Sequence, residues 1–167
     1  MLLGLSKIID CPGASVSFAT SLDLSGLDFG GCYPAQEPVQ ASGTVRNTAG
    51  VLLLTGTVGT RLHGVCDRCA RPFQRQVDYP LQVVLTADQD GGDQEDPWVF
   101  PLVGDSVDLD DVITTAFVLN MDSKLLCEPD CKGLCCRCGA NLNDGPCGCQ
   151  PEMDSRFAAL KQLLQDQ

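Results

Sequence analysis

The sequence has no long hydrophobic run. Its longest uninterrupted apolar stretches, such as Val51–Leu54 and Ala116–Leu119, reach only four residues, whereas a membrane-spanning helix needs about 18 or more. We therefore expect no membrane segment. The first residues, Met1–Leu5, lead directly into Ser6-Lys7 without a basic leader, so we also expect no secretory signal and a cytoplasmic protein.

The usual elements of catalysis are equally scarce. The chain has no phosphate-binding glycine motif and no nucleophile elbow, and its only histidine is His63. The simplest interpretation of His63 is a surface or hydrogen-bonded side chain, with a fourth metal ligand as the alternative. We therefore expect a protein that is not an enzyme and has no small-molecule substrate.

Basic residues are few. The 167 residues include 11 Lys and Arg against 22 Asp and Glu, so the formal net charge is −11. This balance excludes a generally basic nucleic-acid coat but not a local basic face. The length suits about one domain, and the apolar fraction of 44% suits a globular fold.

Residues 1–125 are expected to form a β-rich body. Several segments are rich in Val, Leu and Thr and partly alternate between apolar and polar residues; they are Ser15–Leu24, Val39–Val45, Val51–Leu62 and Gln74–Leu85. Asn47–Gly50 is typical of a hairpin turn. The pattern predicts an α+β protein with an antiparallel β meander or open barrel.

Two helices and an acidic loop complete this prediction. Residues 86–111 hold nine acids and no Lys or Arg, and their centre, residues 88–97, is typical of a solvated loop. Trp98–Phe100 fits a short strand. Apolar residues at helical spacing predict a helix over residues 108–119, capped by Asp108, and a C-terminal helix over residues 151–167.

Cysteine, in contrast, is abundant, with 11 residues that are unevenly placed. Eight of them form four local pairs: Cys66 with Cys69, Cys127 with Cys131, Cys135 with Cys138, and Cys147 with Cys149. In a reducing compartment such pairs are more often metal ligands than disulfides. We expect Cys11 and Cys32 to be buried or half-exposed thiols and Cys136 to be a spare thiol.

The spacing of the pairs predicts sites for one or two Zn²⁺ ions in residues 126–150 and at the first pair. Cys135, Cys138, Cys147 and Cys149 can form one tetrahedral site, and a second site would join the other four cysteines. The pairs can also combine in other ways. A redox dithiol is the alternative for Cys66 and Cys69, because neighbouring arginines would lower a thiol pKa, and an iron–sulfur centre is a further alternative.

These cysteines lie in two motifs that resemble one known family. Val65–Phe73, with the sequence Val-Cys-Asp-Arg-Cys-Ala-Arg-Pro-Phe, resembles the Cys-x-Arg-Cys-x-x-Pro-Phe signature of the YceD-like family. Leu126–Asn143, Cys147–Cys149 and Asp154–Leu160 resemble the C-terminal part of that family. The resemblance covers about residues 50–165.

The resemblance implies a cytoplasmic bacterial protein, or an organellar relative, that is needed for the accumulation of large-subunit ribosomal RNA. It also implies that the protein is not an enzyme and that the metal is structural. Cys136 departs from the family pattern, which has proline there. The hypothesis is thus a factor for ribosome assembly that binds RNA or a ribosomal protein, and the alternative is a thiol redox or iron–sulfur protein.

Such a factor would act in one of two ways, and the first is direct binding of RNA by a small arginine-rich face. Four arginines lie within 15 residues around the first cysteine pair: Arg61, Arg68, Arg71 and Arg75. Guanidinium groups bind phosphate, and Phe73 beside them would stack on a base. The alternatives are that the arginines neutralise nearby acids and that Phe73 belongs to the core. The second way is docking of a basic ribosomal protein on the acidic segment, residues 88–111.

Overall fold

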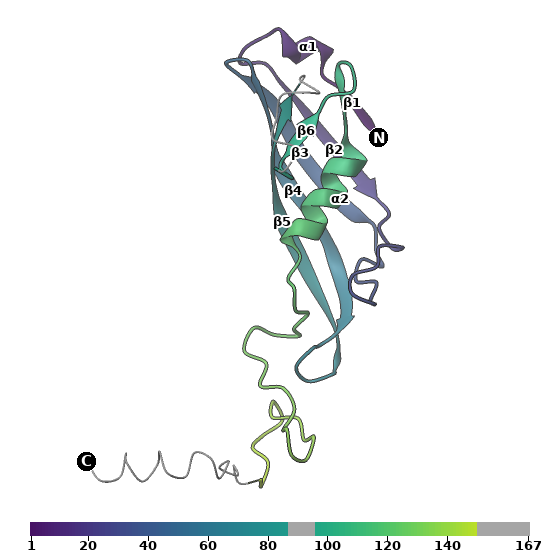
Figure 1. The fold of residues 1–167 in the computed structure, drawn as a ribbon, viewed down its shortest axis with the longest axis vertical. Helices are drawn as coiled ribbons and strands as arrows, with labels where there is room; N and C mark the ends of the chain where they lie inside the picture. Colours follow the sequence, from purple (N-terminus) through teal and green to yellow (C-terminus); the bar gives the residue numbers. More distant parts are fainter. Residues whose placement is uncertain (87–95, 150–167) are drawn as a thin grey trace, which may run out of the picture.

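The computed structural model describes residues 1–86 and 96–149. Its main element is a five-stranded sheet in the order β2-β3-β4-β5-β6 (Figure 1). The strands are β2 (Ser15–Leu22), β3 (Val39–Thr48), β4 (Val51–Val65), β5 (Pro72–Thr86) and β6 (Val99–Pro101). Strands β2 to β5 form an antiparallel meander, and β6 is parallel to β5. Two short strands, β1 (Leu2–Gly4) and β7 (Ser106–Asp108), pair separately.

The turn between β3 and β4 explains why these strands form a tight hairpin. Ala49 and Gly50 both have positive φ, at 52° and 93°, and this is the geometry that connects two twisted strands through two residues. Thr48 pairs directly with Val51 across the turn. The hairpin turn expected at Asn47–Gly50 is confirmed.

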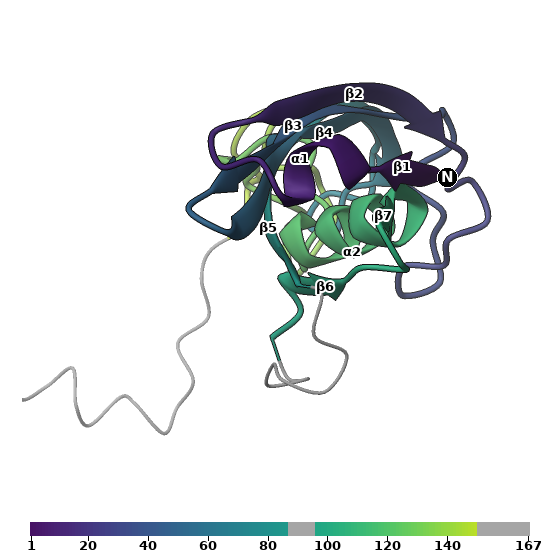
Figure 2. The ribbon, with the colours of Figure 1, turned by 90° about the horizontal axis from the view of Figure 1, so that it is seen from above.

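Helix α2 (Leu109–Asn120) covers one face of the sheet. Viewed from above, the sheet curls around this helix (Figure 2). Asp108 caps the helix by accepting a hydrogen bond from the amide of Asp110 at 3.1 Å. The apolar face of α2 is fully buried against the sheet, with Phe117 as its largest side chain. The predicted helix over residues 108–119 is therefore confirmed within one residue at each end.

A short helix, α1 (Ser6–Ile9), was not expected from the sequence. Its carbonyls are satisfied from far along the chain, because the side-chain amide of buried Asn47 donates to Ile8 at 2.8 Å and to Ile9 at 2.7 Å. The side-chain oxygen of Asn47 accepts from the amide of Gly50 at 2.9 Å. This one-turn helix depends on a tertiary contact, which no local pattern reveals.

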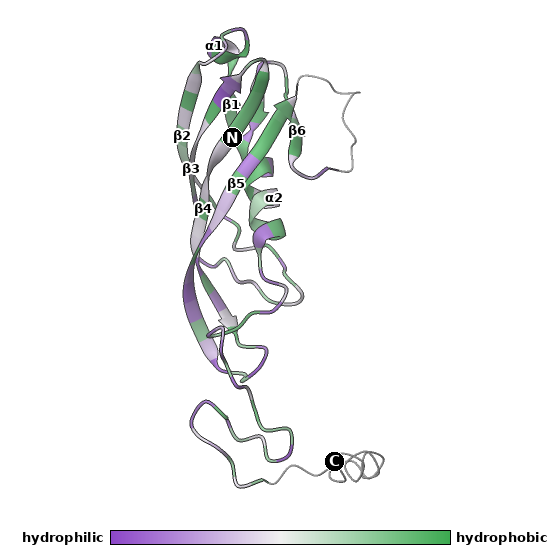
Figure 3. Ribbon diagram, turned by 90° about the vertical axis from the view of Figure 1, so that its left-hand side faces the viewer, coloured by the Kyte–Doolittle hydropathy of each residue, from purple (hydrophilic) through white to green (hydrophobic). Residues whose placement is uncertain are grey.

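The hairpin of β4 and β5 extends beyond the other strands and carries the first cysteine pair at its tip (Figure 1). The two strands are 15 residues long each, and their pairing continues to Val65 and Pro72. Where β5 pairs with β6 the hairpin strands are mostly hydrophobic, and toward the tip they become more hydrophilic (Figure 3). The chain that follows α2 runs along this arm to the remaining cysteines (Figure 1).

The architecture is α+β, and in the described ranges the sheets do not close into a barrel. Of the two expected forms, an antiparallel meander or an open barrel, the meander is confirmed. The helix expected over residues 151–167 lies outside the described residues, as do residues 88–95 of the expected acidic loop. Within the described part of the chain, no helix is both long enough and apolar enough to cross a bilayer.

Candidate metal centre

The tip of the β4–β5 hairpin presents two thiols on a tight turn. The amide of Ala70 donates to the carbonyl of Cys66 at 2.8 Å, and the amide of Cys66 donates to the carbonyl of Arg71 at 2.8 Å. Ala70 lies in the left-handed backbone region, with φ of 55°. This conformation turns the chain back into β5 directly after Cys69.

The turn at Cys135 repeats this backbone geometry. The amide of Gly139 donates to the carbonyl of Cys135 at 2.9 Å, and the amide of Cys135 donates to the carbonyl of Ala140 at 2.8 Å. Gly139 has φ of 72° and thus takes the position that Ala70 takes in the first turn. Two segments 69 residues apart therefore form the same cysteine turn, and they differ in the residue that bears the positive φ.

Replacing Ala70 by glycine is expected to stabilise the protein by about 0.5–1 kcal/mol, because glycine accepts positive φ without the steric penalty of a Cβ atom. Gly139→Ala is expected to destabilise it by a similar amount. Urea unfolding of the metal-loaded chain measures both. Ala140→Gly is the control, since Ala140 is not among the residues with positive φ, and it is expected to destabilise; a loss of stability in Ala70→Gly would contradict the argument.

The hairpin thiols meet two cysteines from the segment that follows α2. Cys66, Cys69, Cys127 and Cys131, which we call the first cluster, have Sγ atoms within 4.8 Å of one another. Two of these distances are 3.8 Å, from Cys66 to Cys131, and 3.7 Å, from Cys69 to Cys127. A tetrahedral ion with metal–sulfur distances of about 2.3 Å has sulfur–sulfur edges of about 3.8 Å. The cluster therefore has the dimensions of a site for one ion.

A second cluster lies further along the chain. Cys135, Cys138, Cys147 and Cys149 also have Sγ atoms within 4.8 Å of one another. Its members are half-buried or exposed, whereas three of the four thiols of the first cluster are buried. Both clusters can hold a metal ion. The sequence left open which of the four cysteine pairs share a site. In the structure, the first pair joins the second, and the third joins the fourth.

The hydrogen bonds of each cluster make its sulfurs unequal. Burial raises the pKa of Cys66, but backbone amides of Cys127 and of the turn outweigh this effect and lower the pKa to about 6. Amides of its own turn lower the pKa of Cys135 to about 6. Burial raises the pKa of Cys127 to about 12, and a hydrogen bond with Cys138 raises that of Cys149 to about 12. A cation entering either cluster therefore displaces protons.

Backbone contacts fix the first cluster between its two chain segments. The amide of Asp67 donates to the carbonyl of Leu125 at 2.8 Å, and the amide of Leu125 donates to the Asp67 carboxylate at 2.7 Å. The Arg68 guanidinium donates to the carbonyl of Cys131 at 3.0 Å, and the Arg68 carbonyl accepts from the amide of Leu134 at 3.0 Å. The two residues inside the first Cys-x-x-Cys turn thus position the opposite half of the cluster.

The four arginines of the expected RNA-binding face each have a partner within the protein. These partners are Glu37 for Arg61, the carbonyl of Cys131 for Arg68, Asp144 for Arg71 and Asp122 for Arg75. The nitrogen–oxygen distances are 3.7 Å for the Arg61 pair and 2.8 Å for the Arg75 pair. The structure brings these arginines to one arm, where they neutralise nearby acids or hold the cluster.

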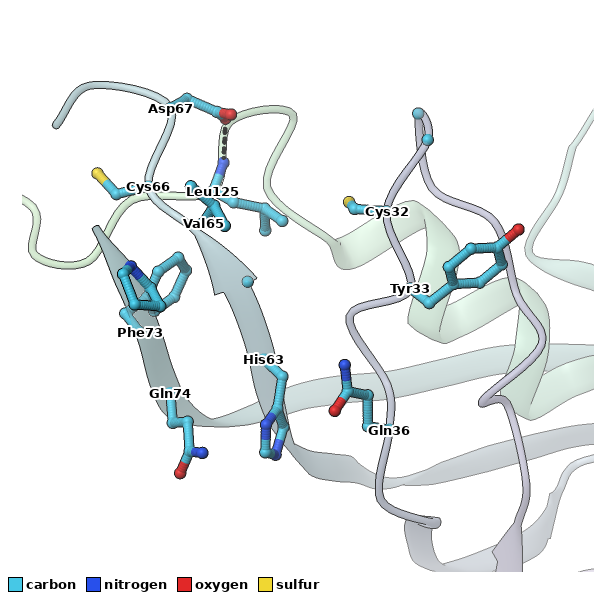
Figure 4. A pocket seen from close by; sticks show the side chains of 14 residues that line it. Cys32, Tyr33, Gln36, His63, Val65, Cys66, Asp67, Phe73, Gln74 and Leu125 are labelled. Atoms are coloured by element: carbon cyan, nitrogen blue, oxygen red, sulfur yellow. Dashed lines mark hydrogen bonds between the residues drawn. The ribbon is translucent and has the colours of Figure 1, made fainter. Parts of the chain in front are cut away.

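A groove of about 910 Å³ lies beside the first cluster, between the end of β4 and the loop before β3 (Figure 4). Phe73 lines the groove and is half-buried, and it packs against both the main core and the first cluster. The Nε2 atom of His63 lies 3.3 Å from the Oε1 atom of Glu37, and His63 does not belong to either cluster. Among the described residues, those that line the groove include no Lys or Arg, so this part of the chain places no fixed cation there for a phosphate.

The other three cysteines lie outside both clusters. Cys32 is half-buried as expected, with its thiol donating to the carbonyl of Phe29 at 2.9 Å, whereas Cys11 is exposed, so the expectation of a buried or half-exposed thiol was wrong there. Cys136 is also exposed. All 11 cysteines lie in the described part of the chain, and none forms a disulfide. Cys136 directly follows Cys135, a member of the second cluster, but is not itself a member of that cluster.

This geometry coincides with a known sequence family. Residues 54–164 match the model of the family described as "Large ribosomal RNA subunit accumulation protein YceD". The chain belongs to the YceD family. The matched region begins in β4 and includes every residue of both clusters. The resemblance found in the two cysteine motifs is thereby confirmed.

Proteins similar to this chain occur in bacteria and plants. An uncharacterized protein of Mycobacterium tuberculosis is 32% identical over 115 residues, which cover 68% of this chain and 56% of the relative. A maize protein named "Large ribosomal RNA subunit accumulation protein YCED homolog 1, chloroplastic" is 31% identical, covering 86% of this chain and 59% of the relative. The Arabidopsis thaliana protein of the same name is 28% identical, covering 78% of this chain and 50% of the relative. The chain thus spans about half the length of these relatives, and no solved structure matches it.

Several residues that build the centre were not predicted from the sequence. The Asp67 carboxylate accepts from the amide of Leu125, and the side-chain amide of Asn143 donates to the Sγ of Cys131; both hydrogen bonds link distant segments. Asn143 lies at the end of the stretch that resembles the family's C-terminal part. The family resemblance of that stretch was the available signal for Asn143, but the distance of Asn143 from the cysteines along the sequence does not reveal which sulfur its side-chain amide contacts.

Proposed function

We propose that this YceD protein is a non-enzymatic factor for the accumulation of large-subunit ribosomal RNA and for ribosome assembly, held in shape by two structural Zn²⁺ ions. The observation that carries this proposal is the pair of four-thiol clusters, each with the dimensions of a single tetrahedral site. The family description supports the link to ribosomal RNA. The protein acts by binding a partner.

The donor set supports structural zinc. Four thiolates satisfy a tetrahedral zinc ion completely and leave no position for a catalytic water or a substrate. Sulfur atoms within 4.8 Å of one another leave room for one ion between them, whereas an iron–sulfur cluster places several irons and sulfides inside its ring of thiolates. Zinc in these sites would bring order to a segment that has little hydrophobic core of its own.

The charge distribution favours a basic ribosomal protein as the partner over RNA. The net charge of −11 repels a phosphate backbone and attracts a cationic surface. The arginines of the hairpin arm are already engaged with acids or with a backbone carbonyl. Binding RNA phosphates there would require breaking these contacts.

Elemental analysis of the purified protein is expected to give two zinc ions per chain and a colourless solution. Each of the two four-thiolate clusters binds one zinc ion, and Zn²⁺ does not absorb visible light. Visible absorbance with bound iron would instead support the iron–sulfur alternative, and a metal-free folded protein would contradict the metal sites.

The role in ribosome assembly has its own test. Depleting the protein from cells is expected to lower large-subunit ribosomal RNA relative to small-subunit RNA, and unchanged RNA levels would overturn the proposal. Sedimentation of the protein with large-subunit precursors, followed by binding assays with purified large-subunit proteins and with naked RNA, identifies the partner. Binding to RNA alone would contradict the choice of a protein partner.

A further inference from the structure

The loop that the second cluster closes turns back onto the first cluster. Residues 139–146 connect Cys138 to Cys147, and within them the side-chain amide nitrogen of Asn143 lies 3.3 Å from the Sγ of Cys131. The side-chain oxygen of Asn143 accepts from the amide of Lys132 at 2.7 Å. The side chain of Asn143, from the loop of residues 139–146, therefore contacts both a cysteine of the first cluster and the backbone beside it.

The position of Asn143 depends on its own loop. Its backbone amide and its side-chain amide each donate to the side-chain oxygen of Asn141 at 2.9 Å. The amide of Leu142 donates to the carbonyl of Gly133 at 2.9 Å. Gly133 has φ of 74°, and a Cβ atom there would lie 2.9 Å from the carbonyl oxygen of Arg68. Glycine thus lets the loop and the hairpin tip approach closely.

A hydrogen bond to a thiolate sulfur affects how strongly that sulfur binds a metal. Four thiolates around a divalent ion carry a net charge of about −2, so an amide that donates to one of them stabilises the loaded site. Outer-shell partners of this kind typically change metal affinity by about 10–100-fold when they are removed. The loop that carries Asn143 begins after Cys138 and ends before Cys147, so both of its ends are members of the second cluster.

We infer that the two clusters bind their ions cooperatively, and that Asn143 is the positioning residue that couples them. An ion in the second cluster orders residues 139–146, directs the Asn143 amide to Cys131 and raises the affinity of the first cluster for Zn²⁺ by about 10-fold. Linkage makes the effect reciprocal, so an ion in the first cluster strengthens the second by the same factor. This inference rests on the proposed zinc sites.

Four versions of the full-length protein test the coupling through a thermodynamic cycle: the unaltered chain, Asn143→Asp, the pair Cys147→Ser with Cys149→Ser, and all three substitutions together. Aspartate keeps the size of the side chain and its acceptor for Lys132 but cannot donate to sulfur. Competition of each chain with a zinc-binding dye gives the affinity of the first site, and native mass spectrometry counts the ions.

We expect Asn143→Asp and the double cysteine variant each to weaken the first site by about 10-fold, and the combination to add little further loss, because both remove the same contact. With Co²⁺, Asn143→Asp is also expected to shift the sulfur-to-cobalt charge-transfer band to lower energy, a change that a purely structural role would not produce. In the unaltered chain at half saturation, the one-ion species is expected to be depleted.

The matched control is Asp144→Asn, the adjacent residue, which removes the ion pair with Arg71 and leaves Asn143 in place. It is expected to keep the coupling. Two bound ions with unchanged first-site affinity in Asn143→Asp, or losses that simply add in the combined variant, would overturn the inference. A chain that binds no ion at all would instead refute the proposed zinc sites.

Discussion

Cys69→Ser is expected to remove one of the two proposed zinc ions and to release the segment after α2 from the hairpin tip. A structural four-cysteine zinc site contributes roughly 10–16 kcal/mol of apparent binding free energy, and a serine hydroxyl is a poor substitute for a thiolate. We expect the melting temperature to fall by about 10 °C or more. Metal analysis and a thermal melt measure both effects.

Hydrogen exchange of the Cys69→Ser variant is the measurement that locates the loss of structure. The amides of Leu125 and Leu134, which donate to Asp67 and to the Arg68 carbonyl, are expected to lose protection, whereas the amide of Ile113 in α2 keeps it. Cys136→Ser is the matched control, because Cys136 is adjacent to a cluster member but lies outside the cluster. Equal metal loss in the two variants would contradict the assignment of ligands.

Gly56→Ala is expected to destabilise the sheet by about 3 kcal/mol or more. Gly56 of β4 lies opposite Gly43 of β3. A Cβ atom on Gly56 would lie 2.2 Å from the carbonyl oxygen of Ser42 and 2.7 Å from the Cα of Gly43. Both neighbours are backbone atoms, so the clash can be relieved only by moving the strands apart.

Denaturant unfolding of the metal-loaded protein checks this expectation. The control is Gly26→Ala, at an exposed glycine whose added Cβ would meet nothing within 4 Å and whose φ is not positive. We expect its free energy of unfolding to stay within about 0.5 kcal/mol of the unaltered value. A Gly56→Ala protein of normal stability would show that the strands separate there without strain.

The meander was predictable because its information is local. Alternating residues and the turn at Ala49 and Gly50 are visible within short windows, and the capping residue Asp108 directly precedes its helix. Helix α1 was missed because Asn47, nearly 40 residues away, satisfies its carbonyls. The open form of the sheet was not decided by the pattern either, because alternation specifies which face is buried but not whether the edges meet.

The cysteine turns themselves were determined by the sequence alone, since a Cys-x-x-Cys turn closes through backbone hydrogen bonds that span at most six residues. Which pairs share a cluster was decided by the tertiary structure. Cys69 and Cys127 are 58 residues apart, and they meet because the long hairpin arm and the end of α2 bring Asp67 to Leu125. The same fold pairs three of the four arginines of the arm with acids from distant segments and the fourth, Arg68, with the carbonyl of Cys131; contacts across such lengths depend on packing and not on local sequence.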